Sequence, residues 1–235
     1  MKDIPQLDQS ITDRLAFETI RVSLPAGAAD VDLYHLEMNN PVPLVIIAHG
    51  FPRHRHNMSG WGRHLAQEGF VAAVPELSAW VDHTRKSRFI SDLIAYLCAS
   101  DPWRQQIDSS RIGLMGFSAG GLATLLAAAE NPQVAIWIGL DPADSRSIGV
   151  KASASIRCRT VVLAAEPSTW NTQGNAGDIV AALPRCEYFK VVGAVHVDAE
   201  WPTDWLAEAV CGRSTEEKRS EFRWRATKAL IETLL

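Results

Sequence analysis

The sequence predicts an α/β fold in which a mostly parallel sheet of eight strands carries helices on both faces. Short apolar segments that favour strands alternate along the chain with segments that favour helices. Several strand segments, such as 43–50 and 160–167, are apolar without alternation, as expected where helices cover both faces of a parallel sheet. The first two strand segments do alternate and no helix follows them, which indicates an antiparallel hairpin at the sheet edge.

The individual elements follow in order from these patterns. The eight strand segments are 16–22, 31–38, 43–50, 70–77, 111–118, 134–141, 160–167 and 188–194. Helices are expected over 57–69, 85–100, 119–132 and 174–184, and in the C-terminal tail. The gap between the sixth and seventh strands is too short for a large helical cap. Because open parallel sheets bind ligands at the carboxyl ends of their strands, we expect an open cleft there.

Length, composition and charge narrow the class of protein. The 235 residues, of which 47% are hydrophobic, suit a single domain spanning 1–235. The formal net charge of −4 gives no electrostatic case for nucleic acid, so the expected partner is a small molecule, with the oligomeric state left open. No segment has the roughly 18 consecutive apolar residues of a membrane span, and 1–15 lacks the apolar core of a secretory signal. This favours a cytoplasmic protein, although a secreted protein trimmed of its signal would look the same.

The four cysteines are Cys98, Cys158, Cys186 and Cys211. They show neither a CxxC pair nor the spacing of metal ligands, so free thiols are expected. Cys158 and Cys186 each precede a predicted strand, and they are the one pair that could form a disulfide if those strands are neighbours. His54 and His56 have an H-x-H spacing, but no cluster of cysteines or carboxylates accompanies them. We therefore expect no metal and no cofactor.

The most specific motif is Gly116-Phe117-Ser118-Ala119-Gly120, which matches G-x-S-x-G where a predicted strand meets a predicted helix. A serine at such a sharp turn has a strained backbone, and small residues two positions to either side avoid clashes with neighbouring elements. The start of the helix also supplies free N–H groups that favour a developing negative charge. Ser118 is therefore the predicted nucleophile. The simpler alternative is an N-cap serine in a glycine-rich turn.

Together with two other segments, this motif resembles the α/β-hydrolase superfamily. The two segments are His49-Gly50-Phe51-Pro52 and Gly139-Leu140-Asp141-Pro142-Ala143-Asp144, and the resemblance covers 43–196. It is strongest to small esterases without a lid, similar to chlorophyllases, dienelactone hydrolases and polyester hydrolases. It implies an oxyanion hole made by the backbone N–H groups of Phe51 and Ala119, each worth roughly 3 kcal/mol in well-studied enzymes. Dienelactone hydrolases proper use a cysteine nucleophile, so Ser118 departs from that branch. A plain turn with a buried His49 is the alternative for the first segment.

His196 is the predicted general base. It follows the last predicted strand and is the final histidine of the chain, as the order of serine, acid and histidine in this fold requires. An imidazole can take the serine proton near neutral pH and return it to the leaving group. A structural loop histidine is the alternative.

Two carboxylates compete for the role of triad acid. Asp141 ends the sixth strand segment, in a stretch that resembles the acid-bearing segment of pancreatic-type lipases and chlorophyllases. Glu166 stands at the end of the seventh, which is the more common position in the superfamily. Asp141 is the first choice, because its side chain is short and the following proline is expected to restrict it to an extended backbone. Glu166 is the second choice, and Asp144 and Asp198 are further alternatives.

Aromatic side chains at predicted strand ends are expected to bind substrate: Phe51, Phe117, Trp80 and Trp170. Together these residues predict a lidless serine hydrolase that cleaves a small carboxylic ester through an acyl-enzyme intermediate. A thioesterase or a peptidase could use the same groups, because the choice of leaving group resides in the pocket. A non-catalytic hydrolase fold that binds a ligand is a third hypothesis, and the ordered series of motifs argues against it.

Overall fold

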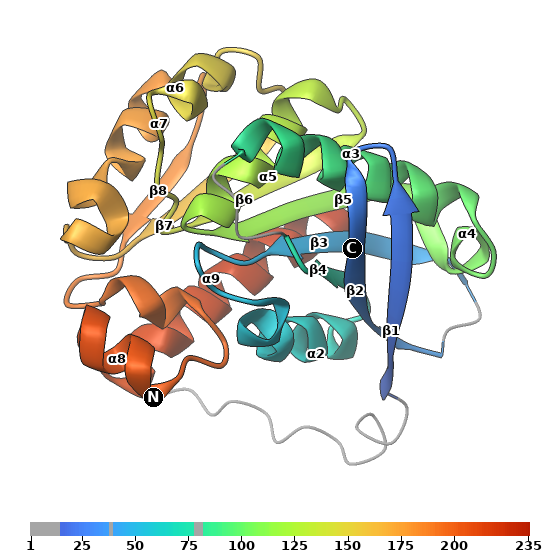
Figure 1. Cartoon of the computed structure of the whole chain (residues 1–235), viewed down its shortest axis with the longest axis horizontal. Coiled ribbons are helices and arrows are strands. Elements are labelled where there is room, and N and C mark those ends of the chain that lie inside the picture. Colours follow the sequence, from blue (N-terminus) through green and yellow to red (C-terminus); the bar gives the residue numbers. More distant parts are fainter. Residues whose placement is uncertain (1–14, 38–39, 78–81) are drawn as a thin grey trace.

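The computed structural model describes residues 15–37, 40–77 and 82–235. Its centre is an eight-stranded sheet with the strand order β1-β2-β4-β3-β5-β6-β7-β8 (Figure 1). The strands are β1 (Leu15–Leu24), β2 (Gly27–Leu36), β3 (Val42–Ala48), β4 (Val71–Pro75), β5 (Ile107–Phe117), β6 (Val134–Leu140), β7 (Arg159–Ala164) and β8 (Glu187–Lys190). β2 pairs antiparallel with β1 and with β4, and every other pair is parallel. The predicted edge hairpin and parallel sheet are confirmed.

Helices cover both faces of this sheet (Figure 1). On one face lie α3 (His83–Ala99), α5 (Ala119–Glu130) and α7 (Ala176–Ala182), and on the other lie α2 (Ser59–Gln67) and α9 (Glu216–Leu234). The shorter elements are α4 (Trp103–Gln106), α6 (Ile148–Ser153), α8 (Trp205–Cys211) and the 3₁₀ turns η1 (Arg55–Met58), η2 (Thr169–Gly174) and η3 (His196–Ala199). No helix in the described ranges is long and apolar enough to cross a membrane.

The unbroken apolar run of β3 reflects its burial on both faces. Leu44 and Ile46 pack in the core beneath α3 and α5, whereas Val45 and Ile47 pack in the core beneath α2 and α9. All four side chains are fully buried. Burial of each such side chain contributes about 1.5–3 kcal/mol, so this strand is a rigid support for the loop at its carboxyl end.

The fold differs from the sequence prediction mainly where elements end. β8 stops at Lys190, so 191–195 form a loop that leads out of the sheet to η3. The short helix α6, which the sequence pattern did not predict, fills the connection between β6 and β7. At six residues it is too small to form a cap.

Candidate active site

Ser118 lies in the turn between β5 and α5 with the backbone angles φ 52° and ψ −122°. Few residues with a side chain adopt a positive φ, and such strain is typical of functional turns. A Cβ atom added at Gly116 would collide with the carbonyl oxygen of Gly120, and one added at Gly120 would collide with that of His49. Both glycines are therefore required by the close approach of neighbouring backbone, as the motif predicted.

The structure brings His196 to Ser118. His196 begins η3, and its Nε2 lies 3.0 Å from Oγ of Ser118. Both residues are 6% exposed, so the contact is largely screened from water. This distance allows a proton to pass from the hydroxyl to the imidazole.

Asp141 lies on the opposite side of the imidazole, directly after β6. Its φ of 43° is in the left-handed region, so the expected extended backbone at this position is wrong. Its Oδ2 is 2.6 Å from Nδ1 of His196, and the residue is fully buried. Oδ1 accepts a hydrogen bond from the backbone N–H of Ala165 at 3.0 Å, and Oδ2 accepts another from Nδ2 of Asn171 at 3.0 Å. These donors compensate the buried carboxylate for the loss of water. Since the carboxylate can accept from Nδ1–H, it leaves Nε2 free to accept the serine proton.

The sequence interpretation missed Asn171, which supports this carboxylate. Asn171 is fully buried in η2, and its Nδ2 also donates to the carbonyl of Glu166 at 2.9 Å. Its Oδ1 accepts the backbone N–H groups of Ser168 and Gly174. No local pattern distinguishes this residue from the solvated asparagines that are common in loops.

The side chain of Glu166, the second-choice acid, binds Lys190 and Gly193 and does not contact His196. Its Oε2 is 2.5 Å from Nζ of Lys190, and its Oε1 accepts the backbone N–H of Gly193 at 3.1 Å. The hydrogen bond from Lys190, followed by that from Gly193, lowers the pKa of Glu166. Its side chain is 39% exposed. Glu166 thus holds the loop that precedes His196 without touching the imidazole.

The two other carboxylates considered as the acid also have structural partners. Asp144 accepts the backbone N–H groups of Gly149 and Val150 at the start of α6. Asp198 accepts from Ser214 and from Nε of Arg219, which ties η3 to the C-terminal helices. Asp141 therefore has the geometry expected of the acid, and its role remains a prediction.

The loop after β3 lies against the nucleophile, as an oxyanion hole requires. A Cβ atom at Gly50 would stand 3.1 Å from Cβ of Ser118, so the backbone that leads to Phe51 passes beside the serine. Ala119 is the first residue of α5, where helical N–H groups have no partner within the helix. His49 is 3% exposed, accepts the backbone N–H of Leu77 through Nε2 at 3.0 Å and donates through Nδ1 to Gly50 at 2.8 Å. This buried histidine fixes the turn.

A protein-family model described as "PETase: PET hydrolase-like" matches residues 9–190. The chain belongs to the PET hydrolase-like family. It is 34% identical over 99 residues to bis(hydroxyethyl) terephthalate hydrolase of Streptomyces coelicolor, a match covering 42% of this chain and 32% of that protein. It is 29% identical over 140 residues to cutinase 2 of Thermobifida cellulosilytica, covering 58% of this chain and 52% of that protein. The chain thus matches about a third to a half of the length of these relatives.

A solved structure extends the comparison to the whole fold of this PET hydrolase-like chain. Dienelactone hydrolase from Anabaena variabilis superposes with a TM-score of 0.73 at 16% identity. The superposition covers 94% of this chain and 100% of that structure. The predicted α/β-hydrolase fold is confirmed, and so is the resemblance to that superfamily. The elements in the described ranges include no large cap.

The aromatic residues expected to bind substrate have different environments in this PET hydrolase-like chain. Phe51 and Trp170 are each 50% exposed, and Nε1 of Trp170 donates to the carbonyl of Val210 at 3.2 Å. Phe117 is only 2% exposed and packs on the ring of His196, with ring centroids 4.6 Å apart. The expected contact of Phe117 with substrate therefore does not fit, because the side chain is in the core behind the histidine. Trp80 lies outside the described residues.

Within the described part of the chain, the remaining polar and sulfur groups form no organised metal site. In the described ranges, no group of three or more His, Cys, Asp or Glu side chains could hold a metal ion. The side chains of His54 and His56 are each 70% exposed, within 4 Å of Glu76 and Asp32 respectively. All four cysteines fall in the described ranges, and each is free.

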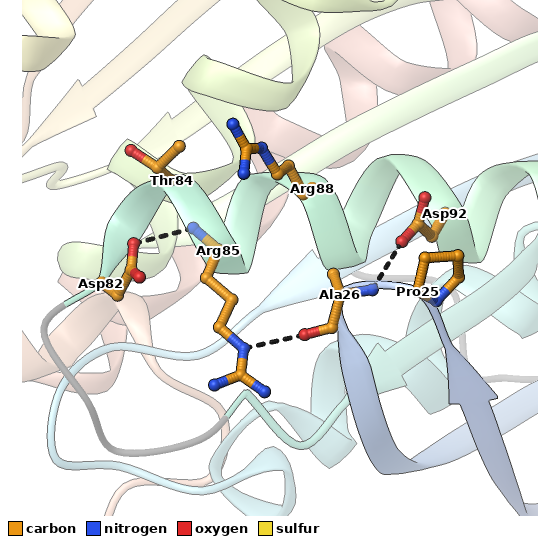
Figure 2. Close-up of a pocket in the computed structure, with 7 residues that line it drawn as sticks. All are labelled: Pro25, Ala26, Asp82, Thr84, Arg85, Arg88 and Asp92. Atoms are coloured by element: carbon orange, nitrogen blue, oxygen red, sulfur yellow. Dashed lines mark hydrogen bonds between the residues drawn. The ribbon is translucent and has the colours of Figure 1, made fainter.

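A cavity of about 560 Å³ lies at the hairpin edge of the sheet. Figure 2 shows its lining residues, which are Pro25, Ala26, Asp82, Thr84, Arg85, Arg88 and Asp92. Nε of Arg85 donates to the carbonyl of Ala26, and Oδ2 of Asp92 accepts the backbone N–H of Ala26. These bonds attach the hairpin turn to α3. Ser118 does not line this cavity, so the cavity belongs to the hairpin and not to the turn that carries Ser118.

Proposed function

We propose that this chain hydrolyses carboxylic esters, with Ser118 as nucleophile, His196 as general base and Asp141 as the acid that orients it. The observation that carries the proposal is the continuous chain of contacts from Oγ of Ser118 through the imidazole of His196 to the buried carboxylate of Asp141, at 3.0 Å and 2.6 Å. A serine, a histidine and an aspartate in this order form a catalytic triad, in which the histidine activates the serine hydroxyl. Family membership and the ester-hydrolase names of the relatives support the same conclusion.

In the first half-reaction, Oγ of Ser118 attacks the ester carbonyl carbon while its proton passes to Nε2 of His196. The carbonyl oxygen becomes an oxyanion that accepts the backbone N–H groups of Phe51 and Ala119. Asp141 stabilises the imidazolium that forms. The C–O bond to the alcohol then breaks, His196 returns the proton to the leaving oxygen, and an acyl-enzyme remains.

In the second half-reaction, water takes the place of the alcohol. His196 removes a proton from water as the water oxygen attacks the acyl carbon, and the same two N–H groups hold the new oxyanion. The bond from the acyl carbon to Oγ of Ser118 then breaks, and His196 returns the proton to Oγ. The products are a carboxylic acid and the free enzyme, and no step uses a cofactor.

The substrate class proposed here is a small ester that binds beside exposed aromatic side chains. Phe51 and Trp170, both half exposed, could contact its acyl or aryl group. The printed names of two relatives, a bis(hydroxyethyl) terephthalate hydrolase and a cutinase, make aromatic diesters and aliphatic esters suitable probes.

Substitution of the nucleophile tests the proposal. Wild type and Ser118→Ala are compared on p-nitrophenyl esters of graded chain length and on bis(2-hydroxyethyl) terephthalate, with matched thioester and anilide substrates alongside. We expect the variant to stay folded but to lose hydrolysis and labelling by a fluorophosphonate, because alanine fits the turn without a nucleophilic oxygen. Wild-type activity in the variant would overturn the mechanism, and a preference for the thioester or anilide would change the substrate class.

A further inference from the structure

A buried ion pair joins the loop of the proposed oxyanion donor to the loop of the proposed base. Arg53 lies two residues after Phe51, and Glu200 lies four residues after His196. Nε of Arg53 donates to Oε1 of Glu200 at 2.7 Å, and Nη2 donates to Oε2 at 3.0 Å. The side chain of Glu200 is fully buried, and that of Arg53 is 19% exposed. Two parallel hydrogen bonds between charged groups fix orientation as well as distance.

Each member of the pair is tied to the backbone of its own loop. The backbone N–H of Arg53 donates to the carbonyl of Gly50 at 3.0 Å, which closes the turn that contains Phe51. The backbone N–H of Glu200 donates to the carbonyl of Val197 at 3.1 Å, within the turn that begins with the proposed base. A shift of either loop would therefore be transmitted to the other through the guanidinium and the carboxylate.

Burial makes the two side chains depend on each other. Burial raises the pKa of Glu200, and the hydrogen bond from Arg53 opposes that rise. Nη2 of Arg53 also contacts Oδ2 of Asp204 at 2.5 Å, and Asp204 caps the start of α8 by accepting the backbone N–H of Ala207. A buried ion pair is often no more stabilising than an apolar pair of the same volume, whereas removal of one partner leaves an uncompensated charge. The pair is thus better explained by the geometry it imposes than by stability.

Neutral contacts that do not involve this pair join the segment around Glu200 to η1 and α2, the elements that follow Arg53 in the chain. The backbone N–H of Trp201 donates to the carbonyl of Asn57 at 2.9 Å, and that of Gly60 donates to the carbonyl of Trp201 at 2.8 Å. Nε1 of Trp61 donates to the carbonyl of Ala199 at 2.9 Å. These bonds should keep the segment around Glu200 attached to η1 and α2 when the ion pair is removed, so a loss of alignment can be separated from a loss of fold.

We propose that Arg53 and Glu200 are positioning residues that hold the N–H of Phe51 and the imidazole of His196 in a common alignment on Ser118. The proposal rests on the proposed function, and it requires no contact of either side chain with substrate. Oxyanion contacts strengthen in the transition state, so poorer alignment should lower kcat and change KM little.

The kinetic test uses Arg53→Met, Glu200→Gln, Glu200→Met and the double variant R53M/E200M. We expect Arg53→Met to lower kcat by about tenfold or more with KM within about threefold, because one oxyanion donor is worth about a hundredfold or more. Glu200→Gln keeps an acceptor for Arg53, so it should lower kcat less than Arg53→Met does. The double variant buries no charge, so its midpoint of thermal unfolding should recover the loss seen in the single variants. Its kcat should not recover. Recovery of kcat together with the midpoint would overturn the proposal.

Arg159→Met is the matched control. Arg159 binds Glu187 and Glu232 at the start of β7, the end of that strand opposite the site, and its loss should leave kcat and KM unchanged.

Amide hydrogen exchange gives a readout that does not need turnover. Arg53→Met should speed exchange in 196–200, Glu200→Met should speed it in 50–57, and the control should do neither. Unchanged exchange in both segments would overturn the coupling, whereas an inactive wild type with coupled exchange would count against the proposed function alone.

Discussion

The carboxyl ends of β6 and β7 each present one carboxylate near the histidine-bearing loop, in opposite environments. Asp141, after β6, is fully buried, and its Oδ2 lies 2.6 Å from Nδ1 of His196. Glu166, after β7, has a side chain that is 39% exposed and lies 2.5 Å from Nζ of Lys190. One carboxylate faces an imidazole in the core, and the other faces an ammonium group in water.

This difference shows why position along the chain does not by itself decide the acid. Attraction between charges is several times stronger in a partly buried site than in bulk water, so a buried carboxylate stabilises an imidazolium more effectively. A buried carboxylate persists only with hydrogen-bond donors, and Ala165 and Asn171 supply them to Asp141. Glu166 instead accepts the backbone N–H of Gly193, in the loop that precedes His196.

The largest effect is expected at the end of β6. We predict that Asp141→Asn lowers kcat by about a hundredfold or more, since the corresponding change in a well-studied serine protease cost about 10⁴ in turnover. An asparagine can present its amide group to Nδ1 and so favour the wrong tautomer of His196. Steady-state kinetics on a p-nitrophenyl ester, with circular dichroism to check the fold, would measure this. A fall of less than tenfold, with a larger fall in Glu166→Gln, would reverse the comparison.

A smaller effect is expected at the residue that supports Asp141. Asn171→Leu removes the hydrogen bond to Oδ2 at similar volume, and we predict a fall in kcat of about tenfold, because hydrogen bonds to charged groups are worth about 1.5–3 kcal/mol. Asn175→Leu is the control, because Asn175 makes the same kind of bonds to the backbone of Asp144, away from the imidazole. Equal losses of kcat in both variants would mean that Asn171 acts only through the fold of the loop.

The smallest effect is expected at the end of β7. Glu166→Gln should lower kcat by less than about tenfold, because its side chain touches the loop and not the imidazole. The hydrogen bond from Lys190 lowers the pKa of Glu166 below its ordinary value of 4.5, so its contribution to stability is present above that value and is lost as pH falls through the lowered one. Urea unfolding of wild type and variant across this range should show the difference in unfolding free energy vanish in acid. A difference that persists at the acid end would contradict this assignment.

Much of the fold follows from local patterns in the sequence. The alternating first two segments predicted the β1–β2 hairpin, and the unbroken apolar run of β3 predicted a strand buried on both faces. Patterns were less informative where packing decides the outcome. The early end of β8 and the short helix α6 were not predicted, because both depend on contacts with neighbouring elements.

By itself, the sequence determined the α/β fold, the serine at a strand-to-helix turn and a histidine in the right chain order, because periodicity and the steric demands of a tight turn are local properties. Tertiary structure alone placed Asp141, and not Glu166, beside His196 and put Phe117 in the core behind that ring. It also paired Arg53 with Glu200 across 147 positions of chain. Burial and contact between residues so far apart depend on how the elements pack, and no short stretch of sequence encodes that packing.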